Sequence, residues 1–151
     1  MRSRYTIKGS FRRAARLGAV QLAYQIEQSD GVLESVISDF EECLDESSRK
    51  RVDLAFVRAL LCGVYDHEKE IDQCVRNNLK PDSPLERMPP VLRAILRVAL
   101  FEMFFMDTPR SVLINEYIEI TKEFFTESEV AFVNGFLDNI SIPDNFQRAV
   151  P

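Results

Sequence analysis

Apolar residues recur every three to four positions along most of the chain, which is the spacing that lines one face of an α-helix. In the first half this spacing predicts helices over about residues 11–28, 32–44 and 54–75. Ser10 is a residue type that caps helix starts, so we expect it to begin the first helix. Asp30-Gly31 and Ser47-Ser48 interrupt the spacing and predict the breaks between these helices.

The second half shows the same spacing after a linker. The best linker candidate is Asn77 to Pro84, which contains two Asn, two Pro, one Asp and one Ser. Beyond it, helices are predicted over about residues 91–106, 113–124 and 130–140. The first of these follows Pro89-Pro90 and is apolar on most sides, so it should be the central buried helix. Thr126 and Glu129 have the spacing of a capping box before the last helix.

The stretch "AFVNGFLDNI" allows two interpretations, because Asn134-Gly135 between apolar residues is also a strong hairpin signal. A hairpin needs alternation with a period of two, whereas the period here is that of a helix, and Pro143 ends it. We therefore predict a helix. Gly135 costs about 1 kcal/mol relative to Ala inside a helix, and the usual reason for such a glycine is close approach of another backbone or a ligand.

These elements predict an all-α fold with two packed helical subdomains of about three helices each. We place a basic amino-terminal tail at residues 1–10, the first subdomain at 11–80 and the second at 81–151. The chain has only 5 Gly and 7 Pro in 151 residues, which leaves little material for many short strands and their turns.

The net charge of −5 conceals an uneven distribution. Residues 1–26 contain six basic residues and no acid, whereas the other 125 residues contain 13 basic and 24 acidic residues, a balance of −11. Arg12 and Arg16 are four residues apart and should project from one side of the helix, with Arg13 beside them. Guanidinium groups suit phosphate oxygens, so this segment is a candidate polyanion site. A solvated basic helix end is the alternative.

The sequence offers no catalytic or metal-binding constellation. His67 is the only His, and in "HEKEI" the position of a second zinc ligand is occupied by Ile71. Arg93, Arg97 and Glu102, with Asn115-Glu116 on the next helix, are best interpreted as a buried polar network that joins two helices. We therefore expect no enzyme activity, no metal and no cofactor.

The compartment indicated by the sequence is the cytoplasm. The three cysteines, Cys43, Cys62 and Cys74, are odd in number and widely spaced, which fits a reducing environment. The longest apolar run, residues 98–106, is too short to span a bilayer, and no apolar signal core follows the basic amino terminus.

Four stretches, "RRAARLGAVQLAYQ", "LRAILRVALFEM", "INEYIEITKEF" and "FVNGFLD", occur in an order and spacing that resembles the NusB family of bacterial transcription antitermination factors. The resemblance covers about residues 11–140. It implies a NusB-like fold, a heterodimer with the ribosomal protein NusE, and joint binding of boxA RNA in nascent ribosomal RNA transcripts within an antitermination complex on RNA polymerase. Some ribosomal RNA methyltransferases begin with a similar domain, but the chain ends at Pro151, so the free factor is expected.

The resemblance also implies site residues. Arg12, Arg13 and Arg16 match the family's arginine-rich RNA segment. Ser128 and Phe132 match a second RNA-facing patch, and Asn134 and Gly135 lie on faces beside Phe132. Tyr24 and Glu86 match positions that face NusE. The chain departs from the family pattern at Leu92, Phe125 and Ala131.

Two classes of function remain open at this point. One is an RNA-binding antitermination factor, with a homodimer as an alternative state when the protein is free. The other is a structural adaptor that holds the ribosomal protein and leaves RNA contact to it.

Overall fold

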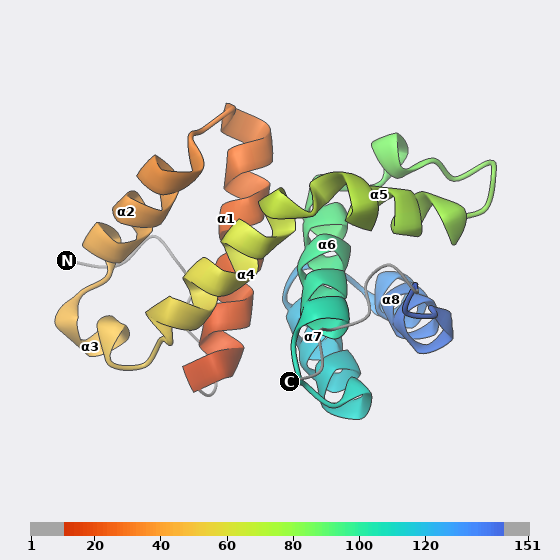
Figure 1. Ribbon diagram of the computed structural model, residues 1–151. Coiled ribbons are helices and arrows are strands. Elements are labelled where there is room, and N and C mark those ends of the chain that lie inside the picture. Colours follow the sequence, from red (N-terminus) through yellow and green to blue (C-terminus); the bar gives the residue numbers. More distant parts are fainter. Residues whose placement is uncertain (1–10, 144–151) are drawn as a thin grey trace. The chain divides into compact units, whose positions relative to one another are not determined.

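The computed structural model describes residues 11–143, and within that range every regular element is a helix (Figure 1). The prediction of an all-α fold is confirmed, and Asn134-Gly135 lies inside a helix. The predicted tail at residues 1–10 and the predicted cap Ser10 lie outside the described residues. The elements are α1 (Phe11–Ser29), α2 (Leu33–Cys43), α3 (Glu46–Arg49), α4 (Leu54–Asp66), α5 (Glu68–Asn77), the 3-10 helix η1 (Leu85–Arg87), α6 (Pro90–Phe105), α7 (Arg110–Phe124) and α8 (Glu127–Asn139).

The first compact unit ends at Asp66 and is built around α1. Helix α1 packs against α4 and α2, and its small residues bring these helices close. A methyl group on Gly18 would lie 3.2 Å from the ring of Phe40 in α2, so the glycine makes room for the aromatic ring. This packing fixes the amino-terminal turns of α1, which carry the predicted arginine site.

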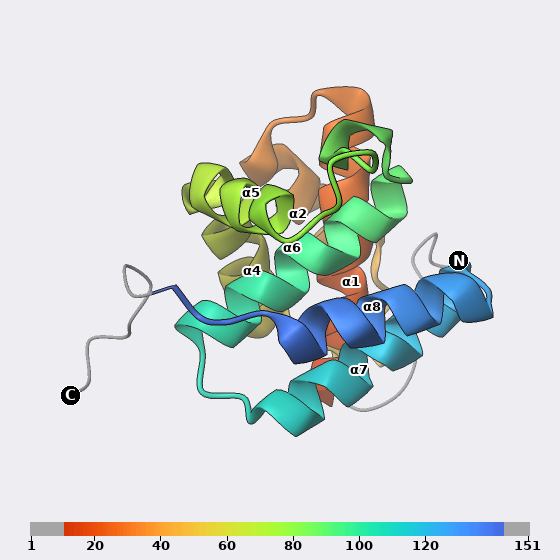
Figure 2. The same cartoon turned by 90° about the vertical axis from the view of Figure 1, so that its right-hand side faces the viewer.

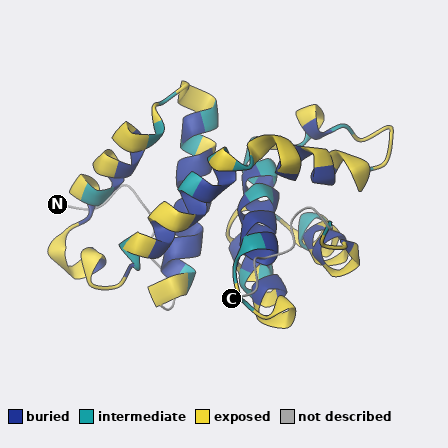
Figure 3. Cartoon of the chain, in the orientation of Figure 1, coloured by how far each residue is buried: buried dark blue, intermediate teal, exposed yellow. Residues whose placement is uncertain are grey.

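The second unit begins at His67 and has α6 at its centre. Helices α5 and α7 both pack on α6, and α8 packs on α7 (Figure 2). Most of α6 is buried, as its sequence predicted (Figure 3). None of the described helices is long and apolar enough to cross a membrane.

The helix predicted over residues 54–75 is in fact two helices, and the prediction of one long helix is wrong. The chain breaks at His67, whose backbone has φ −120° and ψ 21°. The imidazole ring of His67 stacks on the ring of Phe105 at a centroid distance of 4.2 Å. This contact with α6 holds the residue between α4 and α5 away from helical geometry, and the helical spacing of apolar residues continues across the break.

The break also moves the boundary between the two units. The linker predicted a division after residue 80, whereas the compact units divide between Asp66 and His67. Helix α5 belongs to the second unit because Ile71 and Val75 are buried and because Asp72 pairs with Arg97 of α6. The first unit therefore contains α1 to α4 and the second contains α5 to α8 with η1, instead of about three helices each.

Two local signals were only partly correct. Ser47-Ser48, predicted to be a break, lies within the one-turn helix α3, which starts because the Asp45 carboxylate accepts a 2.7 Å hydrogen bond from the Ser48 N–H. The capping box before α8 does not form in the expected way. The Thr126 hydroxyl donates to the Glu129 carboxylate at 3.2 Å and accepts no backbone N–H.

Glu102 makes the buried polar contact of α6. Glu102 is fully buried and accepts hydrogen bonds from the hydroxyls of Tyr117, at 2.7 Å, and Thr108, at 2.6 Å. The bond from Tyr117 joins α6 to α7. A polar contact between these helices was expected, but from Asn115 or Glu116 and not from Tyr117. The α7 residue Asn115 is exposed. Arg93 and Arg97 point to other elements, described below.

Candidate nucleic-acid interface

The arginines predicted to contact RNA gather around one aromatic ring in the first unit. The guanidinium carbon of Arg12 lies 4.3 Å from the ring centroid of Phe56 in α4, and that of Arg16 lies 5.4 Å from it. The Arg12 guanidinium also lies 3.6 Å from the carboxylate of Asp53, just before α4. Cation–π contact and opposite charge thus orient these guanidinium groups. The shared ring confirms that Arg12 and Arg16 project from one side of α1.

The three arginines differ in exposure, which the sequence did not reveal. The Arg12 side chain is 59% exposed, Arg13 is half-buried, and Arg16 is only 5% exposed. One turn further into α1, Arg16 is buried, and its guanidinium faces the ring of Phe56 in α4. Arg12 is therefore the arginine most open to a phosphate group. The RNA contact of each arginine remains a prediction.

Ser128 and Phe132 lie one turn apart on α8 in the second unit. The Phe132 ring is 36% exposed and lies tilted by 43° against the buried ring of Phe136, with centroids 5.8 Å apart. The Ser128 hydroxyl donates a short hydrogen bond to the carboxylate of Glu129. That bond lowers the pKa of the Glu129 carboxyl, so the carboxylate stays charged beside the serine.

Phe132 separates two surface hollows that lie between α8 and the chain that follows α5. The first has a volume of about 410 Å³ and contains Ser128, Met88 and Leu92 in its wall. The second has a volume of about 500 Å³ and lies beside Gly135 and Asn139. Leu79, Ser83 and Phe132 line both hollows, so they form one depression along α8. An aromatic ring with open space on both sides can stack on a planar ligand.

Asn134 does not join this depression. It is exposed on α8 and lines neither hollow, because two residues along a helix turn the side chain to nearly the opposite face. The structure thus brings Ser128 and Phe132 together and leaves Asn134 apart from them. Gly135, predicted to allow close approach, has no heavy atom of a neighbouring element of the described structure within 4 Å of an added methyl group.

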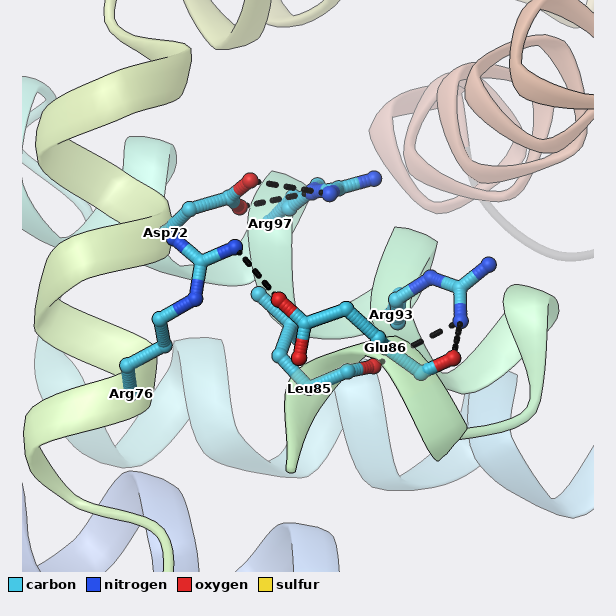
Figure 4. A network of polar contacts seen from close by, with 6 residues as sticks. All are labelled: Asp72, Arg76, Leu85, Glu86, Arg93 and Arg97. Carbon is cyan, nitrogen blue, oxygen red and sulfur yellow. Dashed lines mark hydrogen bonds and ion pairs between the residues drawn. The ribbon is translucent and has the colours of Figure 1, made fainter.

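Glu86, predicted to face NusE, lies in η1 within a polar network (Figure 4). Its exposed carboxylate accepts a 2.8 Å hydrogen bond from Arg76 of α5, and this bond lowers the pKa of the Glu86 carboxyl. Arg93 of α6 donates to the carbonyls of Met88, at 2.6 Å, and Glu86, at 3.3 Å. The segment that carries Glu86 is therefore held to α5 and α6 from two sides.

A largely buried ion pair joins the same two helices (Figure 4). The Arg97 guanidinium donates to both carboxylate oxygens of Asp72, at 2.8 and 2.9 Å. A bidentate pair of this kind fixes direction as well as distance. It gives η1 a rigid support on α5 and α6.

Tyr24, the other residue predicted to face NusE, lies in α1 of the first unit and is 38% exposed. It is one of the large apolar side chains that remain open to solvent. Its exposure fits a contact residue, and its partner remains a prediction.

Comparison with known proteins assigns this architecture to a family. The sequence profile of the NusB family matches residues 13–141. The chain belongs to the NusB family. It is 39% identical over 136 residues to the transcription antitermination protein NusB of Caulobacter vibrioides, covering 86% of this chain and 91% of that protein. It is 36% identical over 136 residues to the protein of the same name from Mesorhizobium japonicum, covering 86% and 88%.

Solved structures of the NusB family share the fold. T. maritima NusB has 32% sequence identity and a TM-score of 0.73, with 89% of this chain and 94% of that chain covered. A chain in the crystal structure of antitermination factors NusB and NusE in complex with dsRNA has 18% identity and a TM-score of 0.67, with 85% and 93% covered. The second likeness shows the fold alone.

Two of the three positions expected to depart from the NusB family pattern lie in the walls of the depression. Ala131 is exposed in the wall of the second hollow, and Leu92 is buried in the wall of the first. Phe125 is half-buried directly after α7.

The residues that support the candidate site carry no recognisable signal in the sequence. Phe56 orients the arginines, yet it is one apolar residue among many in a helix, and no spacing distinguishes it. Leu79, Arg87 and Met88 line the depression from the segment interpreted as a linker. The two Asn and two Pro of that linker predicted a loop, but nothing in the sequence placed this loop beside α8.

In the described part of the chain, no three His, Cys, Asp or Glu side chains gather in a way that could hold a metal ion. The three cysteines are free thiols, and Cys74 is buried. Burial raises the pKa of the Cys74 thiol.

Proposed function

We propose that this member of the NusB family is a transcription antitermination factor that binds boxA RNA of nascent ribosomal RNA transcripts as a heterodimer with NusE. The observation that carries the proposal is the arginine cluster on Phe56 at the start of α1, in a segment of +6 on a chain that is otherwise at −11. Its relatives carry the name transcription antitermination protein. Exposed Phe132 supplies a stacking surface in the second unit.

The remaining parts of the proposal follow from this role. The heterodimer would act in the cytoplasm as part of an antitermination complex on RNA polymerase, without catalysis, metal or cofactor. Tyr24 and Glu86 would face NusE. In the absence of NusE, a homodimer that covers the basic segment is a further possibility that sedimentation of the free protein would test.

One observation favours the alternative, a structural adaptor without direct RNA contact. Arg16 is buried and Arg12 is partly neutralised by Asp53, so the cluster presents less charge than the sequence implies. In that case NusE alone would contact the RNA, and the arginines would serve the packing of α1 on α4.

A salt titration of RNA binding distinguishes the two. Each phosphate neutralised on single-stranded RNA contributes about −0.7 to the slope of log affinity against log salt. The double variant Arg12→Ala/Arg13→Ala, in complex with NusE, should therefore make the slope less negative by up to about 1.4. Arg16 is left unchanged because its burial would confuse folding with binding.

The control removes the same charge elsewhere in the first unit. Arg58 pairs with Glu34 and Glu41 on the outer side of α4, and Lys50 is exposed after α3. The variant Lys50→Ala/Arg58→Ala should keep the wild-type slope. An unchanged slope in the Arg12/Arg13 variant, with NusE capture intact, would support the adaptor instead.

A further inference from the structure

The two compact units meet along the chain at His67. Helix α4 ends at Asp66 and α5 begins at Glu68, so a single residue outside helical geometry separates them. The Ile71 N–H already donates to the His67 carbonyl at 3.0 Å, with the spacing of an α-helix. The chain is therefore helical up to this residue and again directly after it.

The local sequence does not require a break at this junction. Residues 64–71 contain neither Gly nor Pro, the residues that most often end a helix, and apolar residues keep helical spacing from Leu54 to Val75. The two glutamates in the first turn of α5 favour a helix start through the helix dipole, but glutamate is also a good residue inside a helix. A continuous helix would pair the N–H groups of residues 67–70 with the carbonyls of residues 63–66.

A row of three aromatic rings holds the junction in its broken form. The ring of His67 stacks on Phe105 with centroids 4.2 Å apart and planes at 23°, and Phe105 stacks on Phe101 at 5.1 Å and 22°. Phe101 is buried in α6, so the row ties the junction to the central helix of the second unit. Helical geometry at His67 would change its φ of −120° and its ψ of 21° by about 60° each, which turns the ring away from Phe105.

We infer that the stack of His67 on Phe105 selects between two states of this junction. In the stacked state α4 and α5 are separate helices, as described above. In the joined state the ring has left Phe105, and α4 continues into α5 as one helix. The state of the junction governs binding, because joining the helices changes the course of the chain between the two units.

This second part of the inference rests on the proposed function. The proposed RNA residues Arg12 and Phe132 belong to different units, and so do the proposed NusE residues Tyr24 and Glu86. Each partner therefore needs both units at once. Only the stacked state offers both halves of each contact to one partner.

Amide hydrogen exchange, measured by NMR on the free protein, tests the junction. In wild type the N–H groups of residues 68–70 should exchange quickly, because they have no partner within α5. His67→Ala removes the ring and introduces the best helix former, so these amides should become protected by about tenfold or more. The amides of α6 report unfolding of the second unit as a whole and correct for any change in its stability.

Two further variants isolate the stack. His67→Phe keeps a ring against Phe105 and should leave residues 68–70 unprotected, as in wild type. Phe105→Leu keeps an apolar side chain on α6 but removes the ring, so it should protect the same amides as His67→Ala does. The double variant His67→Ala/Phe105→Leu should add nothing further, because both changes remove one contact.

The consequence for binding is measured with NusE and with single-stranded boxA RNA. If the joined state takes about nine tenths of the population, the apparent affinity falls about tenfold, because only the remaining tenth is competent to bind. His67→Ala and Phe105→Leu should therefore capture NusE about tenfold more weakly, and RNA in complex with NusE likewise. His67→Phe should bind both as wild type does.

The outcomes separate the junction from the proposed function. Unprotected amides in His67→Ala, or protected amides in His67→Phe, would mean that ring stacking does not hold the break, and the inference fails while the proposed function stands. Protection without a loss of binding would overturn the second part alone. If wild-type protein binds neither NusE nor RNA, the proposed function fails together with the second part, whereas hydrogen exchange still decides the state of the junction.

Discussion

The guanidinium of Arg76 donates a 2.8 Å hydrogen bond to the carboxylate of Glu86 and thereby joins α5 to η1. Both side chains are exposed, so the pair adds little to the stability of the fold. The pair instead sets the orientation of the Glu86 side chain, which it holds at the surface proposed to face NusE. This arrangement allows a contact residue to be distinguished from a residue that only positions another.

The first prediction is that Glu86→Lys weakens capture of NusE. The new ammonium group would face Arg76 and Arg93, which repel it, and the charge offered to NusE would be reversed. Because Glu86 is exposed, the helical circular dichroism spectrum should not change. The measurement is isothermal titration of NusE into the variant and the wild type.

The matched control exchanges the two charges. The double variant Arg76→Glu/Glu86→Arg restores an ion pair between α5 and η1 but leaves a positive charge at position 86. If Glu86 contacts NusE, the double variant should remain as defective as Glu86→Lys. Normal capture by the double variant would mean that the pair only positions η1, and Glu86 would no longer be a contact residue.

Most helices could be predicted from the sequence because their apolar spacing is local. The exception at His67 shows where that information ends. Apolar residues keep helical spacing from Leu54 to Val75, and nothing near His67 signals a break. The stacking of its ring on Phe105, almost forty residues later in the chain, decides the geometry. A contact between distant residues is not encoded in any local pattern.

The candidate site, like the fold, could be predicted only in part from the sequence. Residue types and the spacing of Arg12, Arg16, Ser128 and Phe132 could be predicted, since each pair lies one turn apart on a helix. The burial of Arg16 could not be predicted, because it depends on the packing of α1 on α4. The depression along α8 could not be predicted either, because its second wall comes from a loop some fifty residues earlier in the chain.

The second prediction concerns the buried carboxylate of α6. Glu102 is fully buried and depends on the hydroxyls of Tyr117 and Thr108. Tyr117→Phe removes one donor and leaves part of a buried carboxylate without its bond, which should lower the free energy of unfolding by about 1–3 kcal/mol. Urea unfolding followed by circular dichroism measures it.

Tyr65→Phe is the control for the loss of a hydroxyl group. Its hydroxyl is only half-buried and donates at 3.4 Å to a neutral carbonyl, that of Ala23. The loss there should be smaller, below about 1 kcal/mol. Equal losses in the two variants would show that the charge of Glu102 does not set the cost.

The third prediction is a dependence of stability on pH at the start of α3. The Ser48 backbone N–H donates to the Asp45 carboxylate and lowers the pKa of that carboxyl below its ordinary value of 3.8. A lowered pKa contributes stability above the ordinary value, and this stability is lost as the pH falls through the pKa of the folded protein. The urea midpoint of wild type should therefore exceed that of Asp45→Ala at pH 7, and the difference should shrink towards pH 3. A difference that stays constant over this range would mean that the charged form of Asp45 does not cap α3.

The last prediction compares two neighbouring rings on α8. Phe132 is 36% exposed between the two hollows, whereas Phe136 is 8% exposed and belongs to the core. Phe136→Ala should cost about 3–5 kcal/mol of stability, as buried aromatic residues do. Phe132→Ala should change the melting temperature little. If Phe132 stacks on a base, its loss should weaken RNA binding by roughly 1–3 kcal/mol, with little change in the salt slope, because stacking neutralises no phosphate.

The combination of readouts identifies the role of Phe132. A base-stacking residue loses RNA affinity alone, at an unchanged melting temperature and unchanged NusE capture. A core residue, like Phe136, lowers the melting temperature and weakens both partners together. Titrating single-stranded boxA RNA at several salt concentrations in the presence of NusE, alongside thermal unfolding, measures all of these on the same samples. If Phe132→Ala behaves like Phe136→Ala, the exposed ring supports the fold and the RNA patch on α8 must be sought elsewhere along the helix.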